Sequence, residues 1–251
     1  MVTPPDAGSS IPVLLVTAGT RAYPMSQSEP SIPWPETVKF IGQFNHDIRN
    51  HLNAIELQSA FLGEIIEEAE AKDEVRRLRE MTAAMGAALQ KLSGQLSKIN
   101  PSTMSYQGVE LIEDLQSKIT ATHPAEAAAI EWHSSLGQEP IEIDPHLLIE
   151  AFAELFANAF THSRGSEPLG FSASADDGAL VFTLREPKAE ALEVGEDWGT
   201  RPFAQVRHGH YGLGLFRARA IVAAHQGTMR TTFDPAASTL VTIVTLPQAS
   251  A

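Results

Sequence analysis

Two long stretches of the chain carry apolar residues at the spacing of amphipathic helices. The first has one polar gap at Ser59 and places apolar side chains at Phe40, Phe44, Ile48, Leu52, Ile55, Leu62 and Ile66. The second has one polar position at Thr82 and places them at Val75, Leu78, Met85, Leu89, Leu92, Leu96 and Ile99. The polar segment 67–73 between them is expected to form the turn of a helical hairpin. Two helices cannot bury stripes this wide alone, so we expect two chains to form a dimeric four-helix bundle.

The pattern changes to mixed helix and strand after Asn100-Pro101, where the residue before proline disfavours a helix. Asp144 and Pro145 have the positions of an N-cap and a first helical residue. We predict helices at 109–119, 146–161 and 213–225, and strands at 129–133, 141–143, 169–175, 179–184, 227–233 and 239–246. The segment 176–178 has the composition of a hairpin turn. The predicted fold class is therefore α+β, with a leader at 1–35, a helical hairpin at 36–100 and an α/β sandwich at 101–251.

Composition narrows the function classes. The net charge of −13 argues against a nucleic-acid-binding surface, and the lack of cysteine excludes disulfides and thiolate sites. The best apolar run, residues 11–18, is too short to span a membrane. We therefore expect a cytoplasmic protein with no membrane sensor of its own, and a start at Met25 remains a hypothesis for the proline- and serine-rich leader.

A histidine in the first predicted helix has the surroundings of a phosphoryl acceptor. His46 lies two positions after Phe44, about 200° around the helix, so its side chain should point away from the apolar seam. Asp47 is placed to accept the proton of one ring nitrogen, which makes the other more nucleophilic. Asn50 lies one turn further along the same face and can orient a water for the reverse hydrolysis. A lone His-Asp pair is also common on ordinary helix surfaces. The interpretation of His46 as a phosphoryl acceptor therefore depends on the two motifs described next.

Polar side chains share one face of the helix predicted after Asp144. Glu154 and Asn158 are four residues apart, and His162 continues the same face. Carboxylate and amide oxygens are ligands that Mg²⁺ accepts when it bridges nucleotide phosphates. This face therefore predicts a magnesium site at Asn158 and Glu154, with His162 near phosphate, although a polar stripe on a half-exposed helix would look the same.

A glycine-containing turn precedes the last predicted helix. Gly212, Leu213 and Gly214 lead into an unbroken helical stretch that ends at Gly227. Glycines at a helix start let phosphates approach free backbone amides, and the helix dipole favours the negative charge. The turn therefore predicts a phosphate-binding site.

The three blocks, in this order, resemble the transmitter core of a sensor histidine kinase. His46, Asp47 and Asn50 resemble its H-box, with His51 where a proline is usual. Glu154 and Asn158 resemble the N-box of GHKL-type ATPases, and 211–227 resembles the G2 box and its helix, with His210 in place of the first glycine. The resemblance covers about residues 36–248. It implies a GHKL-type α/β sandwich that binds ATP and Mg²⁺, phosphorylation of His46, a homodimer, a response regulator receiver domain as partner, and a separate sensor protein as a further partner.

The adenine-binding Asp-x-Gly-x-Gly loop of that family is degenerate in this sequence. Glu186 stands at the aspartate position and can still accept a hydrogen bond from the base, but Lys188 and Glu190 replace the two glycines. Asp197-Trp198-Gly199 lies too far along the chain to substitute for it. A divergent active kinase, a histidine phosphotransferase and a non-catalytic regulatory scaffold therefore all stay open, and the retained Glu154, Asn158 and glycines favour the kinase.

Overall fold

The structure is a computed structural model that describes residues 33–137, 140–162, 164–176, 178–195, 197–204, 206 and 210–248. Nearly all of the predicted leader, including Met25, lies outside the described residues, as does Asp177 of the predicted turn.

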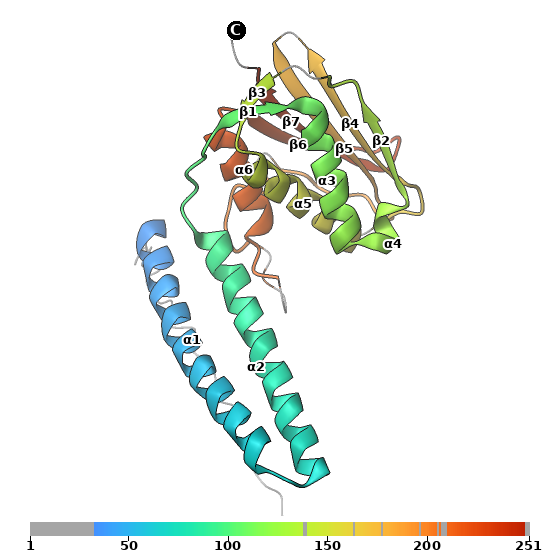
Figure 1. The fold of residues 1–251 in the computed structure, drawn as a ribbon. Coiled ribbons are helices and arrows are strands. Elements are labelled where there is room, and N and C mark those ends of the chain that lie inside the picture. Colours follow the sequence, from blue (N-terminus) through green and yellow to red (C-terminus); the bar gives the residue numbers. More distant parts are fainter. Residues whose placement is uncertain are drawn as a thin grey trace, which may run out of the picture.

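The chain begins with the predicted helical hairpin, formed by α1 (Trp34–Ile65) and α2 (Ala69–Leu96). Pro33 precedes α1, where its missing N–H costs nothing because the first helical N–H groups have no intrahelical partner. The two helices lie side by side and project away from the rest of the chain (Figure 1). No helix in the described residues is long and apolar enough to cross a membrane.

The contact between α1 and α2 follows the apolar stripes predicted from the sequence in part. Its buried residues are Asn45, Leu52 and Ser59 from α1 and Thr82 from α2. Leu52, Ser59 and Thr82 are positions of the predicted stripes, whereas Asn45 lies beside the first stripe. The side chains left exposed include Phe40, Phe44, Leu57, Phe61, Ile65, Met81 and Met85. The predicted stripes thus contain both the buried positions of the hairpin and exposed apolar side chains, and burial of the exposed side chains by a second chain stays a prediction.

The remaining residues form the predicted α+β sandwich. The helices are α3 (Gly108–Thr122), α4 (Pro124–Ala127), α5 (Pro145–Thr161) and α6 (Gly214–Ala224). The strands are β1 (Met104–Gln107), β2 (Ile130–Ser134), β3 (Pro140–Ile143), β4 (Leu169–Asp176), β5 (Ala179–Pro187), β6 (Thr228–Asp234) and β7 (Thr239–Pro247). Only β1 and the short α4 were not predicted.

The strands form a pair, β1-β3, and a five-stranded sheet in the order β2-β4-β5-β7-β6. In the larger sheet β2 runs parallel to β4, and the other neighbours are antiparallel. Helices α3, α5 and α6 cover one face of this sheet (Figure 1). The core between the layers is centred on fully buried Phe156 and Phe182, with Leu111, Leu148 and Ile221 around them.

Asp144 starts α5 as predicted. Its carboxylate accepts the N–H of Leu147 at 3.1 Å and the N–H of Ser102 at 2.9 Å. Burial opposes the charge, but these two hydrogen bonds and the nearby His225 leave the pKa of Asp144 below its ordinary value. The N–H of Asp144 donates to Nε2 of His225, whose Nδ1 must then carry the proton that it donates to the Ile221 carbonyl. This network ties the start of α5 to the end of α6 and so fixes the two helices that carry the candidate site.

Candidate functional site

His46 stands exposed on α1, with the two predicted partners beside it. Its side chain is 68% exposed, and Nδ1 lies 3.3 Å from Oδ1 of Asp47 and 3.4 Å from Nδ2 of Asn50. Gln43, one turn earlier, donates to the same carboxylate oxygen at 2.9 Å. A carboxylate only accepts, so Asp47 favours the tautomer with the proton on Nδ1 and the lone pair on Nε2, and in this tautomer Nδ1 accepts no hydrogen bond from Nδ2 of Asn50. The outward-facing ring is thereby left with a nucleophilic nitrogen directed at solvent.

A cavity of about 540 Å³ lies between α5, the end of β5, the turn before α6 and α2. This volume is in the usual range for small-ligand sites. The structure brings seven residues predicted from separate blocks into its lining: Glu154, Asn158, His162, Glu186, Gly212, Leu213 and Gly214. His46, Asp47 and Asn50 are not among the lining residues.

The two glycines of the turn before α6 are each required, for different physical reasons. Gly212 has a φ of 65°, in the left-handed region that side chains disfavour. A Cβ at Gly214 would collide with the Glu154 carboxylate and lie 3.9 Å from Nδ2 of Asn158. The start of α6 therefore approaches the polar face of α5 closely, and only glycine allows this approach.

Asn158 and Glu154 present polar atoms to the cavity. Nδ2 of Asn158 is buried without a hydrogen-bond partner, and Glu154 forms no ion pair among the described residues. No group of three or more His, Cys, Asp or Glu side chains in the described part of the chain could hold a metal by itself. Two oxygen ligands fit Mg²⁺ nonetheless, because this ion usually takes one or two protein ligands and completes its shell with waters and phosphates.

Glu186 forms a buried ion pair with the lysine that replaces a family glycine. Nζ of Lys188 lies 2.8 Å from Oε2 of Glu186 and donates to the His162 carbonyl at 2.8 Å. Burial raises the pKa of Glu186, and the ammonium of Lys188 partly offsets this rise. The predicted base-recognition carboxylate is therefore in the cavity, but it already has an internal partner.

The segment 197–199, considered too distant in sequence, also lines the cavity. Arg219 of α6 donates to the Trp198 carbonyl at 2.7 Å and to the Met229 carbonyl at 2.7 Å. These two bonds attach the segment to α6 and β6. This proximity could not be predicted from the sequence, because a long connection separates β5 from α6.

The helical hairpin contributes a wall that the sequence did not indicate. Lys91 and Gln95 of α2 line the cavity, and Oε1 of Gln95 is buried without a partner. Their spacing places them on one helix face. The sequence gives no signal for this role, because it depends on how the hairpin lies against the sandwich.

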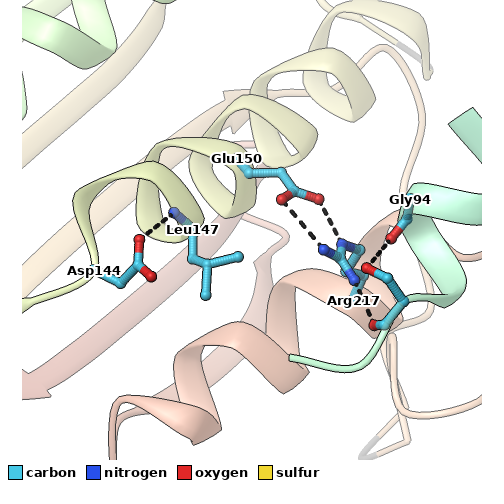
Figure 2. Close-up of polar contacts among 6 residues, drawn as sticks. Gly94, Asp144, Leu147, Glu150 and Arg217 are labelled. Atoms are coloured by element: carbon cyan, nitrogen blue, oxygen red, sulfur yellow. Dashed lines mark hydrogen bonds and ion pairs between the residues drawn. The ribbon is translucent and has the colours of Figure 1, made fainter. Parts of the chain in front are cut away.

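Polar and aromatic contacts hold the hairpin against the sandwich. Arg217 of α6 pairs with Glu150 of α5, at 2.5 Å and 3.3 Å, and donates to the Ser97 carbonyl at the end of α2, at 3.0 Å (Figure 2). At the start of α1, the ring of Trp34 lies 5.5 Å from that of Phe203 and 5.4 Å from that of Phe216. Both hairpin helices are thus attached beside the cavity.

Comparison with known proteins identifies the fold. No protein-family model and no curated protein matches the sequence. Full-length ShkA, solved in complex with AMPPNP, is 19% identical and matches over 85% of this chain and 46% of its own, with a TM-score of 0.65. The chain thus spans less than half the length of ShkA. The Acinetobacter baumannii histidine kinase AdeS is 17% identical over 82% of this chain and 98% of its own, with a TM-score of 0.49. The similarity to ShkA shows that the chain has the histidine kinase core fold, a helical hairpin followed by an α/β catalytic domain.

Proposed function

We propose that this chain is a cytoplasmic histidine kinase of a two-component system, which phosphorylates His46 from Mg-ATP and passes the phosphoryl group to a response regulator. One observation carries the proposal: the polar and glycine blocks that lie far apart in the sequence line one cavity of nucleotide size, on a chain that also presents an exposed imidazole at His46.

The side chains around His46 suit a nucleophilic role. With the proton held on Nδ1 by Asp47, the lone pair of Nε2 attacks the γ-phosphorus. The nitrogen–phosphorus bond forms while the bond to the β,γ-bridging oxygen breaks, and ADP leaves. The carboxylate of Asp47 stabilises the positive charge that develops on the ring. An aspartate of the regulator then attacks the phosphorus and releases the imidazole.

The cavity supplies groups for each part of the nucleotide. Glu186 would accept a hydrogen bond from the base, and the backbone amides around Gly212 and Gly214 would receive the phosphates. Asn158 and Glu154 would hold Mg²⁺, which neutralises charge on the transferred phosphoryl group when bound. These roles are supported by the positions of the side chains in one lining.

Phosphoryl transfer requires a second arrangement of the hairpin or a second chain. His46 lies on α1, whereas α2 lines the cavity in this arrangement. The exposed phenylalanines of α1 are suited to a homodimer, in which the imidazole of one chain can meet the nucleotide of either chain. The exposed helix faces near His46 would dock the receiver domain, with input from a separate sensor protein.

A histidine phosphotransferase is the second candidate, and the buried Glu186–Lys188 pair favours it. The adenine base of a nucleotide must compete with Lys188 for the Glu186 carboxylate. This competition weakens nucleotide binding but does not affect His46. In that case His46 receives its phosphoryl group from a phosphorylated regulator. A regulatory scaffold would accept no phosphoryl group by either route.

Labelling with γ-³²P-ATP separates these candidates. Label on the wild-type chain that is lost in His46→Gln supports the kinase. Label that reaches His46 only from a phosphorylated receiver domain replaces the kinase with the phosphotransferase. A chain that takes no label from either donor would be a scaffold, and the proposal would be wrong.

A further inference from the structure

We propose that helix α2 completes the nucleotide site, with Lys91 binding the phosphate end of the ligand and Gln95 accepting a hydrogen bond from it. The inference rests on the proposed nucleotide-binding function. It adds a positioning residue from the hairpin to a site otherwise formed by the catalytic domain.

The first argument for a role of Lys91 is the distribution of charge in the cavity. Among the described residues, three lysine or arginine side chains line it: Lys91, Lys188 and Arg201. Lys188 is paired with Glu186 at 2.8 Å, and Arg201 is paired with Asp197 at 3.2 Å. Lys91 forms no ion pair with any described residue, since none of the ion pairs in this part of the chain includes it. Lys91 is therefore the described lysine or arginine of this lining that has no ion-pair partner, whereas the Arg201 pair is exposed and weak.

The second argument is that two buried polar atoms beside the cavity lack hydrogen-bond partners. Oε1 of Gln95 and Nδ2 of Asn158 are both buried without a partner, and both residues line the cavity. An unpaired buried polar atom costs free energy unless a ligand or water satisfies it. The two residues belong to α2 and α5, so a ligand that contacts both touches the hairpin as well as the catalytic domain.

The third argument is that the end of α2 is attached to the sandwich beside the cavity. Arg217 donates to the carbonyl of Ser97, the residue that ends α2, and is itself held by Glu150. Gln95 precedes Ser97 by two residues, and Lys91 lies one turn earlier on the same face as Gln95. The Arg217 contacts thus fix this end of α2 over the cavity, and Lys91 stands at its exposed rim. Bound nucleotide would in turn hold the hairpin in this arrangement.

Calorimetric titration of the full chain with three probes tests the proposal: Mg-ATP, adenosine and inorganic tripolyphosphate. Loss of one charge-assisted contact predicts that Lys91→Gln binds ATP about tenfold more weakly, equivalent to about 1.4 kcal/mol. Adenosine binding should not change, and Lys91→Arg should retain most of the ATP affinity. Lys72→Gln, at the far end of α2 and outside the lining, is the matched control.

The outcomes distinguish this inference from the proposed function. Equal ATP affinity in wild type and Lys91→Gln overturns the role of Lys91 while the nucleotide site stands. Tripolyphosphate binding that depends on Lys91, without ATP binding, supports Lys91 as a phosphate ligand and overturns the proposed kinase. A wild-type chain that binds neither ATP nor tripolyphosphate overturns both.

Discussion

Replacement of Lys188 by methionine tests one feature of the candidate site, the buried ion pair between Lys188 and Glu186. The substitution removes the 2.8 Å contact with Glu186 and the hydrogen bond to the His162 carbonyl. The side chains of Lys188 and Glu186 are only 2% and 6% exposed, so water has little access to the carboxylate that loses its partner. Breaking one side of such a pair costs about 3 kcal/mol of unfolding free energy, because the remaining charge stays buried.

The destabilisation by Lys188→Met should depend on pH. Burial already raises the pKa of Glu186 above its ordinary value of 4.5, and removal of the ammonium raises this pKa further. A carboxyl group with a raised pKa in the folded state favours folding below its unfolded pKa, and this contribution is lost as pH rises through the folded pKa. The loss of stability should therefore be largest at about pH 8 and smaller at about pH 5, because a lower pH protonates a larger fraction of the Glu186 carboxylate.

Urea unfolding followed by circular dichroism measures this effect at both pH values. Lys118→Met is the control, since Lys118 is an exposed lysine on α3 of the same domain. The double variant Glu186→Gln, Lys188→Met should recover most of the lost stability, because the buried charge is gone. A loss below about 0.5 kcal/mol, typical of a surface substitution, or a loss that does not vary with pH would refute the reasoning.

Two further predictions follow from the start of α5 and from the exposed face of α1. Asp144→Ala should lower the free energy of unfolding by about 1 kcal/mol near neutral pH. The difference should vanish as pH falls through the lowered pKa of Asp144, because this stabilisation is complete above the unfolded pKa and is lost as the folded carboxylate is protonated. A difference that persists in acid would contradict the capping role. Phe61→Glu should convert a dimer to a monomer in light scattering, while Gln58→Glu, at an exposed polar position, should not; a wild-type chain that is already monomeric would contradict the four-helix bundle.

Much of the fold could be predicted because its signals are local. Apolar periodicity gave the helices, the turn at 176–178 gave the β4-β5 hairpin, and Asp144-Pro145 gave the start of α5. The short β1 was missed, because its pairing with β3 joins segments that are distant in sequence. The exposure of Phe40 and Phe44 within the predicted stripe was not expected for a single chain, because periodicity shows that a face is apolar but not which neighbour covers it.

The candidate site could be predicted only in part, for a similar reason. Asn158 and Gly212 belong to local motifs whose chemistry depends on residue type and spacing, so the sequence could nominate them. Gln95 and Lys91 line the cavity only because Arg217 holds α2 against the sandwich, and no local pattern encodes that contact. The internal pairing of Glu186 likewise depends on the conformation of the β5 end rather than on composition.

The measurement that bears most directly on the proposed kinase is mass-spectrometric mapping of phosphate after the full chain is incubated with Mg-ATP. The proposal predicts an acid-labile phosphate on the peptide that contains His46, which persists in His51→Gln and disappears in His46→Gln. A chain that binds ATP measurably and carries phosphate on another residue, or carries none, would contradict it.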